Sequence, residues 1–242
     1  MSTIMRIRAI TFDLDDTLWP IAPVMLRAEQ RLDNWLHAHC PRAAAVYPIA
    51  AMRVLRDRIA DENPQLAHDF SAQRRLSLQQ ALLPHGYHDD HVEGAFAAFY
   101  AERNRVECYA DTLPALERLS AHYPLAVITN GNADLHATGI APHFRFAVHA
   151  STFGSAKPAV EIFHAACERL GFAPDEVLHV GDDPELDVIG AHRAGLRSAW
   201  LQRGTISWSE ASRQSAVQPD WIVRSLAKLT DLLAPPARVG VH

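Results

Sequence analysis

Short runs of hydrophobic residues alternate along the chain with longer amphipathic stretches. The runs lie at residues 7–12, 125–129, 144–149, 177–181, 197–201 and 221–223. Their length and their polar or turn-forming flanks are typical of strands buried in a parallel sheet. Between them, apolar residues recur at every third or fourth position, a spacing that indicates helices. These helices are predicted near residues 113–121, 159–170 and 187–194. The alternation predicts an α/β fold built on a parallel sheet.

A long segment after the first predicted strand breaks this alternation. Residues 20–106 contain no strand-like run, but apolar residues at spacings of three and four indicate several helices. We therefore predict an all-helical insertion at 20–106 within an α/β core formed by residues 1–19 and 107–234. The tail, residues 235–242, begins with two prolines and is expected to be disordered.

Two carboxylates follow the first predicted strand at a spacing of two, Asp13 and Asp15. Alternate residues of a strand share a face, and the carboxyl end of a strand is where an open α/β sheet holds its chemistry. Two unpaired negative charges there would repel each other by about 4 kcal/mol at roughly 4 Å and an effective dielectric near 20. The pattern therefore implies a bound cation, and an all-oxygen cluster suits Mg²⁺.

Further polar residues follow the later segments. Thr129 and Asn130 end the second run, Asp182 and Asp187 follow the run at 177–181, and Lys157 stands before a proline. Lysine is rare in this chain, which has only Lys157 and Lys228 beside 21 arginines, so a compact point charge is favoured at position 157. Since parallel strands end at one edge of the sheet, we expect these side chains to gather there.

The ordered set of motifs resembles the haloacid dehalogenase superfamily. It comprises Asp-x-Asp-x-Thr at 13–17, Thr129 before Asn-Gly, Lys157 before Pro, and Gly-Asp with a second Asp at 181–187. The match spans residues 7–201. The resemblance implies a Rossmann-like parallel core with an all-helical cap inserted after the first strand, at 20–106, closing over the active site.

The resemblance also implies a role for each carboxylate. Asp13 would attack phosphorus as the nucleophile and form an aspartyl-phosphate, and Asp15 would act as general acid and base. Asp13, Asp182 and the backbone carbonyl of Asp15 would bind magnesium, while Asp187 would orient the cluster from behind. Whether Asp183 touches the metal stays open.

The remaining motif residues would bind the phosphoryl group. Thr129, Asn130 and the backbone after Thr129 can donate hydrogen bonds to its oxygens, and Lys157 can neutralise charge on both nucleophile and phosphate. Trp19, at the expected entry to the cap, could stack on a flat substrate ring or simply pack core against cap.

Asp15 favours phosphoryl transfer over dehalogenation, because a halide leaves without a proton. The family's phosphonate cleavage uses a cap lysine, and no lysine is present from residue 1 to 156. A phosphomutase, a permissive phosphatase for sugar phosphates or phosphoglycolate, a dehalogenase and a non-catalytic phosphate-binding protein remain as alternatives. A signalling receiver domain has similar residues but is about half this length and lacks the helical insertion.

Three sequence segments make the resemblance more specific. They lie at residues 11–18, 128–133 and 178–183. They resemble the bacterial branch that dephosphorylates flavin mononucleotide (FMN) and 5-amino-6-(5-phosphoribitylamino)uracil, a precursor of riboflavin. We therefore expect one of these small phosphorylated metabolites as the substrate.

Composition and charge limit the partners and the cellular location that we expect. The net charge of −5 and the pI near 6.3 offer no basic patch for nucleic acid. No apolar run has the length of a membrane span, and the N-terminus lacks a signal-peptide pattern, so we expect a cytoplasmic enzyme with no membrane partner. The 14 histidines have no ligand spacing and nearly all are interpreted as surface or capping residues. Nothing in the sequence indicates an oligomeric state.

Overall fold

The computed structural model describes residues 7–212 and 215–233, which form two compact units. The first contains the chain up to Pro20, Glu107–Thr129 and the chain from Gly139 onward. The second contains Ile21–Val106 and Asn130–Thr138. The predicted tail, residues 235–242, lies outside the described residues.

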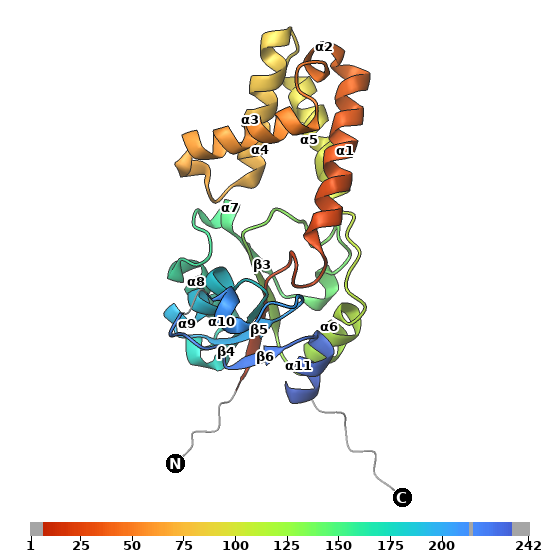
Figure 1. Ribbon diagram of the computed structural model, residues 1–242. Coiled ribbons are helices and arrows are strands. Elements are labelled where there is room, and N and C mark those ends of the chain that lie inside the picture. The colour runs from red at the N-terminus through yellow and green to blue at the C-terminus, as the bar shows by residue number, and fades with distance from the viewer. Residues whose placement is uncertain (1–6, 213–214, 234–242) are drawn as a thin grey trace, which may run out of the picture. The chain divides into compact units, whose positions relative to one another are not determined.

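A parallel sheet forms the centre of the first unit, with six strands among the described residues (Figure 1). In spatial order they are β3 (Ala147–His149), β2 (Leu125–Thr129), β1 (Ala9–Phe12), β4 (Val177–Gly181), β5 (Arg197–Leu201) and β6 (Trp221–Val223). Because β1 pairs with both β2 and β4, the residues that follow these three strands emerge next to one another. The predicted α/β class with a parallel sheet is confirmed.

The strand boundaries agree with the hydrophobic runs except at two positions. β1 begins at Ala9 rather than at residue 7, and β3 begins at Ala147 rather than at residue 144. Residues just before β3 still bond β2, since the Arg145 amide donates to the Leu125 carbonyl. They follow the short turn η3 (Ala141–His143), in which Pro142 fixes the backbone and delays the regular strand.

Helices pack around the sheet of the first unit. They are α6 (Thr112–Ser120), α7 (Ala150–Phe153), α8 (Val160–Leu170), α9 (Gly190–Arg193), α10 (Trp208–Ala211) and α11 (Leu226–Leu233), with the short turn η4 (Pro174–Glu176). The apolar face of α8, with Ile162 and Phe163, is buried in one cluster with Ala126 and Ile128 of β2. This packing follows from the spacing of three and four that predicted the helix.

The predicted helix at 187–194 differs in the structure. A π-helical turn, η5 (Pro184–Ile189), precedes α9, so the helical segment begins three residues earlier. Asp183 causes the early start, because its Oδ1 accepts hydrogen bonds from the amides of Glu185 and Leu186. Asp183 is thus a helix cap, and the two capping hydrogen bonds explain why an aspartate occupies this position.

The two chain segments that join the units are tied together within the first unit. The Tyr109 amide and the Thr112 hydroxyl both donate to the Leu18 carbonyl, at 3.0 and 2.8 Å. Arg203 pairs with Asp111 at 3.0 Å and also donates to the Thr17 carbonyl at 3.0 Å. These hydrogen bonds hold the loop after β1 in place against the segment that leads into α6.

The second unit contains only helices among its regular elements in the described chain. They are α1 (Ile21–His39), α2 (Pro41–Ala44), α3 (Ile49–Glu62), α4 (Phe70–Leu82) and α5 (Asp89–Arg103), with short turns η1 (Pro64–Leu66) and η2 (Leu83–His85). Leu36, Leu82 and Phe96 belong to its buried core. No helix in the described part of the chain is long and apolar enough to cross a membrane.

Candidate active site

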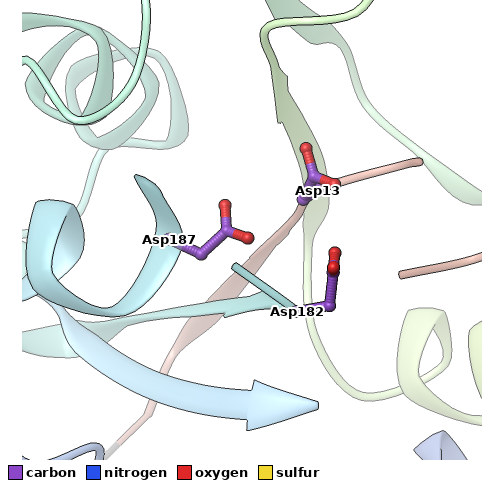
Figure 2. A group of neighbouring side chains, drawn as sticks. All are labelled: Asp13, Asp182 and Asp187. Atoms are coloured by element: carbon purple, nitrogen blue, oxygen red, sulfur yellow. The ribbon is translucent and has the colours of Figure 1, made fainter. Parts of the chain in front are cut away.

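Asp13 lies at the centre of the candidate site because β1 lies at the centre of the sheet. Its amide continues the strand ladder by donating to the Val180 carbonyl at 2.9 Å. The side chain, only 11% exposed, faces Asp182 and Asp187, which follow β4 (Figure 2). One oxygen from each of these three carboxylates lies within 4.8 Å of the others. The structure thus brings together residues that the sequence places about 170 positions apart.

Lys157 joins two of the three carboxylates. Its buried Nζ donates to Asp13 Oδ1 at 2.6 Å and to Asp187 Oδ1 at 2.5 Å. Burial alone would lower the pKa of Lys157, but the two carboxylates outweigh it and raise that pKa above its usual range. Lys157 is therefore a permanent positive charge beside Asp13.

Asp187 uses both of its oxygens within the protein. Oδ1 also receives a hydrogen bond from His179 Nε2 at 3.1 Å, and Oδ2 accepts from the Asp183 amide at 3.0 Å. Burial would raise the pKa of Asp187, but the Lys157 charge and the His179 hydrogen bond lower it below its usual range. Most of its acceptor capacity is filled, which supports an orienting role rather than direct metal binding.

Asp182 has a different environment. Its Oδ1 accepts from the Thr17 hydroxyl at 2.8 Å, and its backbone carbonyl accepts from Trp200 Nε1 at 2.7 Å. Burial and the neighbouring carboxylates raise the pKa of Asp182 to about 8 and that of Asp13 to about 7, although Lys157 opposes the shift at Asp13. Carboxylates with raised pKa values in an all-oxygen cluster fit a site for a hard divalent cation.

Asp15 is half-buried and lies close enough to raise the pKa of Asp13. Its Oδ1 accepts a hydrogen bond from Trp19 Nε1 at 2.8 Å. Trp19 is fully buried, which favours the packing interpretation over stacking on a substrate ring. Asp16, which follows Asp15, has a φ of 58°, a left-handed conformation that Asp adopts more readily than most residues and that is typical of a turn.

Thr129 and Asn130 lie at the carboxyl end of β2, the strand next to β1. Thr129 is the last residue of β2 and is buried. Asn130 is half-buried and begins the segment Asn130–Thr138 of the second unit. Within that unit the segment is bonded to α4, since Asn132 Nδ2 donates to Ser71 Oγ at 3.0 Å.

The sequence analysis assigned no role in the site to three residues that bond the site carboxylates or a group bonded to them: Thr11, Thr17 and His179. It grouped nearly all histidines with the surface, but His179 has no exposed surface. A signal was present, because a polar residue inside an apolar strand must find a hydrogen-bonding partner. The identity of that partner depends on strand register, which the sequence does not state.

Comparison with known proteins shows which class of enzyme this chain belongs to. The model of the haloacid dehalogenase-like hydrolases matches residues 7–195. The chain belongs to this family of hydrolases. It is 34% identical to the Escherichia coli 5-amino-6-(5-phospho-D-ribitylamino)uracil phosphatase YigB, over 94% of this chain and 97% of that protein.

Other relatives have different activities. An E. coli phosphoglycolate phosphatase is 28% identical, with 98% of this chain and 96% of that protein covered. A crystal structure of a 2-haloacid dehalogenase from Pseudomonas syringae pv. tomato superposes with a TM-score of 0.86 at 36% identity, covering 96% of this chain and all of that one. The relatives agree on a hydrolase and differ in substrate.

Gly181 offers a test of the cluster's packing. A Cβ at this position would lie 2.2 Å from Asp187 Cγ, closer than real contacts allow, and Asp187 is held by Lys157, His179 and the Asp183 amide. Gly181→Ala should displace Asp187 and lower turnover of p-nitrophenyl phosphate about 100-fold, the effect of a displacement of about 1 Å. Gly204→Ala is the control, because a Cβ there meets no atom within 4 Å. Equal turnover in the two variants would contradict this account.

Proposed function

We propose that this hydrolase is a magnesium-dependent phosphomonoester phosphatase that works through an aspartyl-phosphate on Asp13. The observation that carries the proposal is the buried ammonium of Lys157, which bonds Asp13 at 2.6 Å inside a cluster of three carboxylates. Such a group orients the nucleophile and offsets the charge of an incoming phosphate. Relatives named as phosphatases support the reaction class.

The first half of the reaction forms a bond between an Asp13 carboxylate oxygen and phosphorus while the ester P–O bond breaks. Asp15 gives its proton to the leaving alkoxide oxygen, a contribution typically worth a factor of about 10² to 10⁴. In the second half, Asp15 takes a proton from a water molecule whose oxygen bonds to phosphorus, while the bond between the Asp13 oxygen and phosphorus breaks; inorganic phosphate leaves and the Asp13 carboxylate is restored. Lys157 stays charged throughout.

Asp13, Asp182 and the backbone carbonyl of Asp15 would hold the magnesium ion. When bound, it supplies positive charge that offsets the carboxylates and the phosphoryl oxygens. Thr17 supports Asp182 for this purpose through the hydrogen bond to its Oδ1. Thr129 ends β2 and Asn130 follows it, and their hydroxyl, amide and backbone N–H groups would donate to the phosphoryl oxygens.

For the substrate we propose FMN or 5-amino-6-(5-phosphoribitylamino)uracil. The support is the relative named for the second compound, which is 34% identical along nearly its whole length. Phosphoglycolate is the second candidate because another relative is named for it. Dehalogenation is less favoured, because halide departure gives Asp15 no proton to transfer.

A panel of substrates tests both the proposed reaction and the proposed substrate. Purified protein with magnesium should release phosphate from FMN and the ribitylaminouracil phosphate with the highest kcat/KM, above phosphoglycolate and simple sugar phosphates. Halide release from 2-chloropropionate should stay at background. A preference for phosphoglycolate would replace the substrate but keep the reaction, whereas halide release without phosphate release would replace the reaction.

Metal removal gives the second prediction. Exhaustive chelation should abolish phosphate release, and added magnesium should restore it. Magnesium at about 100 times its Kd should also stabilise the folded protein by about 2.7 kcal/mol, measured as a higher Tm. Asp182→Asn should lose most of this rise, while Asp175→Asn, at an exposed turn, should keep it. Full activity after chelation would reject the metal assignment.

A third experiment distinguishes the roles of Asp13 and Asp15. Asp13→Asn removes the nucleophile, so turnover of every ester should fall below detection. Asp15→Asn should still attack p-nitrophenyl phosphate, whose leaving group needs little protonation, and should accumulate phosphate on Asp13. Mass spectrometry after rapid acid quench locates the modification. Phosphate on another residue, or near-normal activity of Asp13→Asn, would contradict the mechanism.

A further inference from the structure

Two fully buried polar side chains lie behind the site, inside the sheet. Thr11 of β1 and His179 of β4 are direct neighbours in the strand register, and neither has exposed surface. Thr11 Oγ1 lies 2.8 Å from His179 Nδ1, and His179 Nε2 lies 3.1 Å from Asp187 Oδ1. Together with Lys157, these groups form a continuous chain of hydrogen bonds that ends on Asp13.

We propose that Thr11 and His179 are positioning residues, which hold the Asp187 carboxylate and thereby aim the Lys157 ammonium at Asp13. Neither touches substrate. The inference rests on the proposed phosphatase function, because it assigns these residues to the same reaction.

The protons of this chain can be assigned from the geometry. Asp187 Oδ1 is an acceptor that already faces an ammonium, so His179 Nε2 must carry a hydrogen. Burial lowers the pKa of His179 although Asp187 opposes that shift, so the ring is neutral and Nδ1 is an acceptor. The Thr11 hydroxyl must then donate to Nδ1. Its alternative acceptor, the Leu178 carbonyl, is 3.5 Å away, longer than a good hydrogen bond.

The hydroxyl of Thr11 therefore supports the tautomer of His179 that the Asp187 carboxylate requires, because it gives Nδ1 a donor. Without this donor, the tautomer with hydrogen on Nδ1 becomes accessible, and that tautomer would turn an acceptor nitrogen toward the Asp187 carboxylate. Asp187 would lose one of the three hydrogen bonds that fix its two oxygens. Its carboxylate could then rotate, and Lys157 would lose its fixed direction.

A purely structural role makes a different prediction. Valine has the shape and strand preference of threonine but lacks the hydroxyl, so Thr11→Val keeps the packing. If Thr11 only filled space, this substitution would leave catalysis unchanged. If it positions His179, the loss must appear in kcat, because the missing hydrogen bond acts on the reacting groups rather than on substrate affinity.

The experiment compares Thr11→Val with Thr11→Ser, which keeps the hydroxyl. With p-nitrophenyl phosphate and magnesium, Thr11→Val should lower kcat about tenfold, with KM changed less than about twofold, and Thr11→Ser should recover most of the loss. Thr230→Val is the matched control, because Thr230 is equally buried but donates to the Leu226 carbonyl, in α11. Its kcat should equal that of the wild type.

A second measurement does not use activity. Long-range ¹H–¹⁵N NMR spectra of the wild type should give a neutral His179 with its hydrogen on Nε2. A hydrogen on Nδ1 would overturn the inference, even if Thr11→Val fails to fold. Wild-type kcat in Thr11→Val would overturn it and leave the proposed function standing. A wild-type protein that hydrolyses no phosphate ester would overturn both.

Discussion

The candidate site depends on one buried charge, the ammonium of Lys157. A lone ammonium in this position would cost several kcal/mol in lost hydration, and only close partners can offset that cost. Asp13 and Asp187 provide them at 2.6 and 2.5 Å. The same contacts fix the direction of the Asp13 carboxylate, so the interaction that stabilises the buried charge also orients the proposed nucleophile.

The charges of the cluster do not balance within the protein. Three carboxylates, those of Asp13, Asp182 and Asp187, surround one ammonium, so the fully ionised cluster carries two excess negative charges. Burial, together with the neighbouring carboxylates, raises the pKa values of Asp13 and Asp182 to about 7 and about 8. One divalent cation has the charge that would balance this excess, which connects the electrostatics to the proposed magnesium site.

The sequence predicted those parts of the structure that rest on local patterns. Buried strands such as β2 and β4 followed from their apolar runs, and Asp13, Lys157 and Asp182 followed from polar residues near the ends of such runs. The contact between Thr11 and His179 was not predicted, because it joins residues 168 positions apart and depends on the register of β1 against β4. The π-helical turn was not predicted because its start is set by the Asp183 cap rather than by periodicity.

The core also explains why relatives with one fold carry different substrate names. In the proposed mechanism Asp13, Lys157 and Asp182 would surround the transferring group, so they would respond to its charge and not to the rest of the substrate. Asp15 would be the exception, because as the proposed general acid it would meet the leaving atom: an alkoxide oxygen needs its proton and a halide does not. Its Oδ1 is held by Trp19 Nε1 at 2.8 Å, beside Asp16 in its left-handed turn. With these proposed roles, the short loop after β1 would be where a single fold separates phosphate ester cleavage from halide displacement.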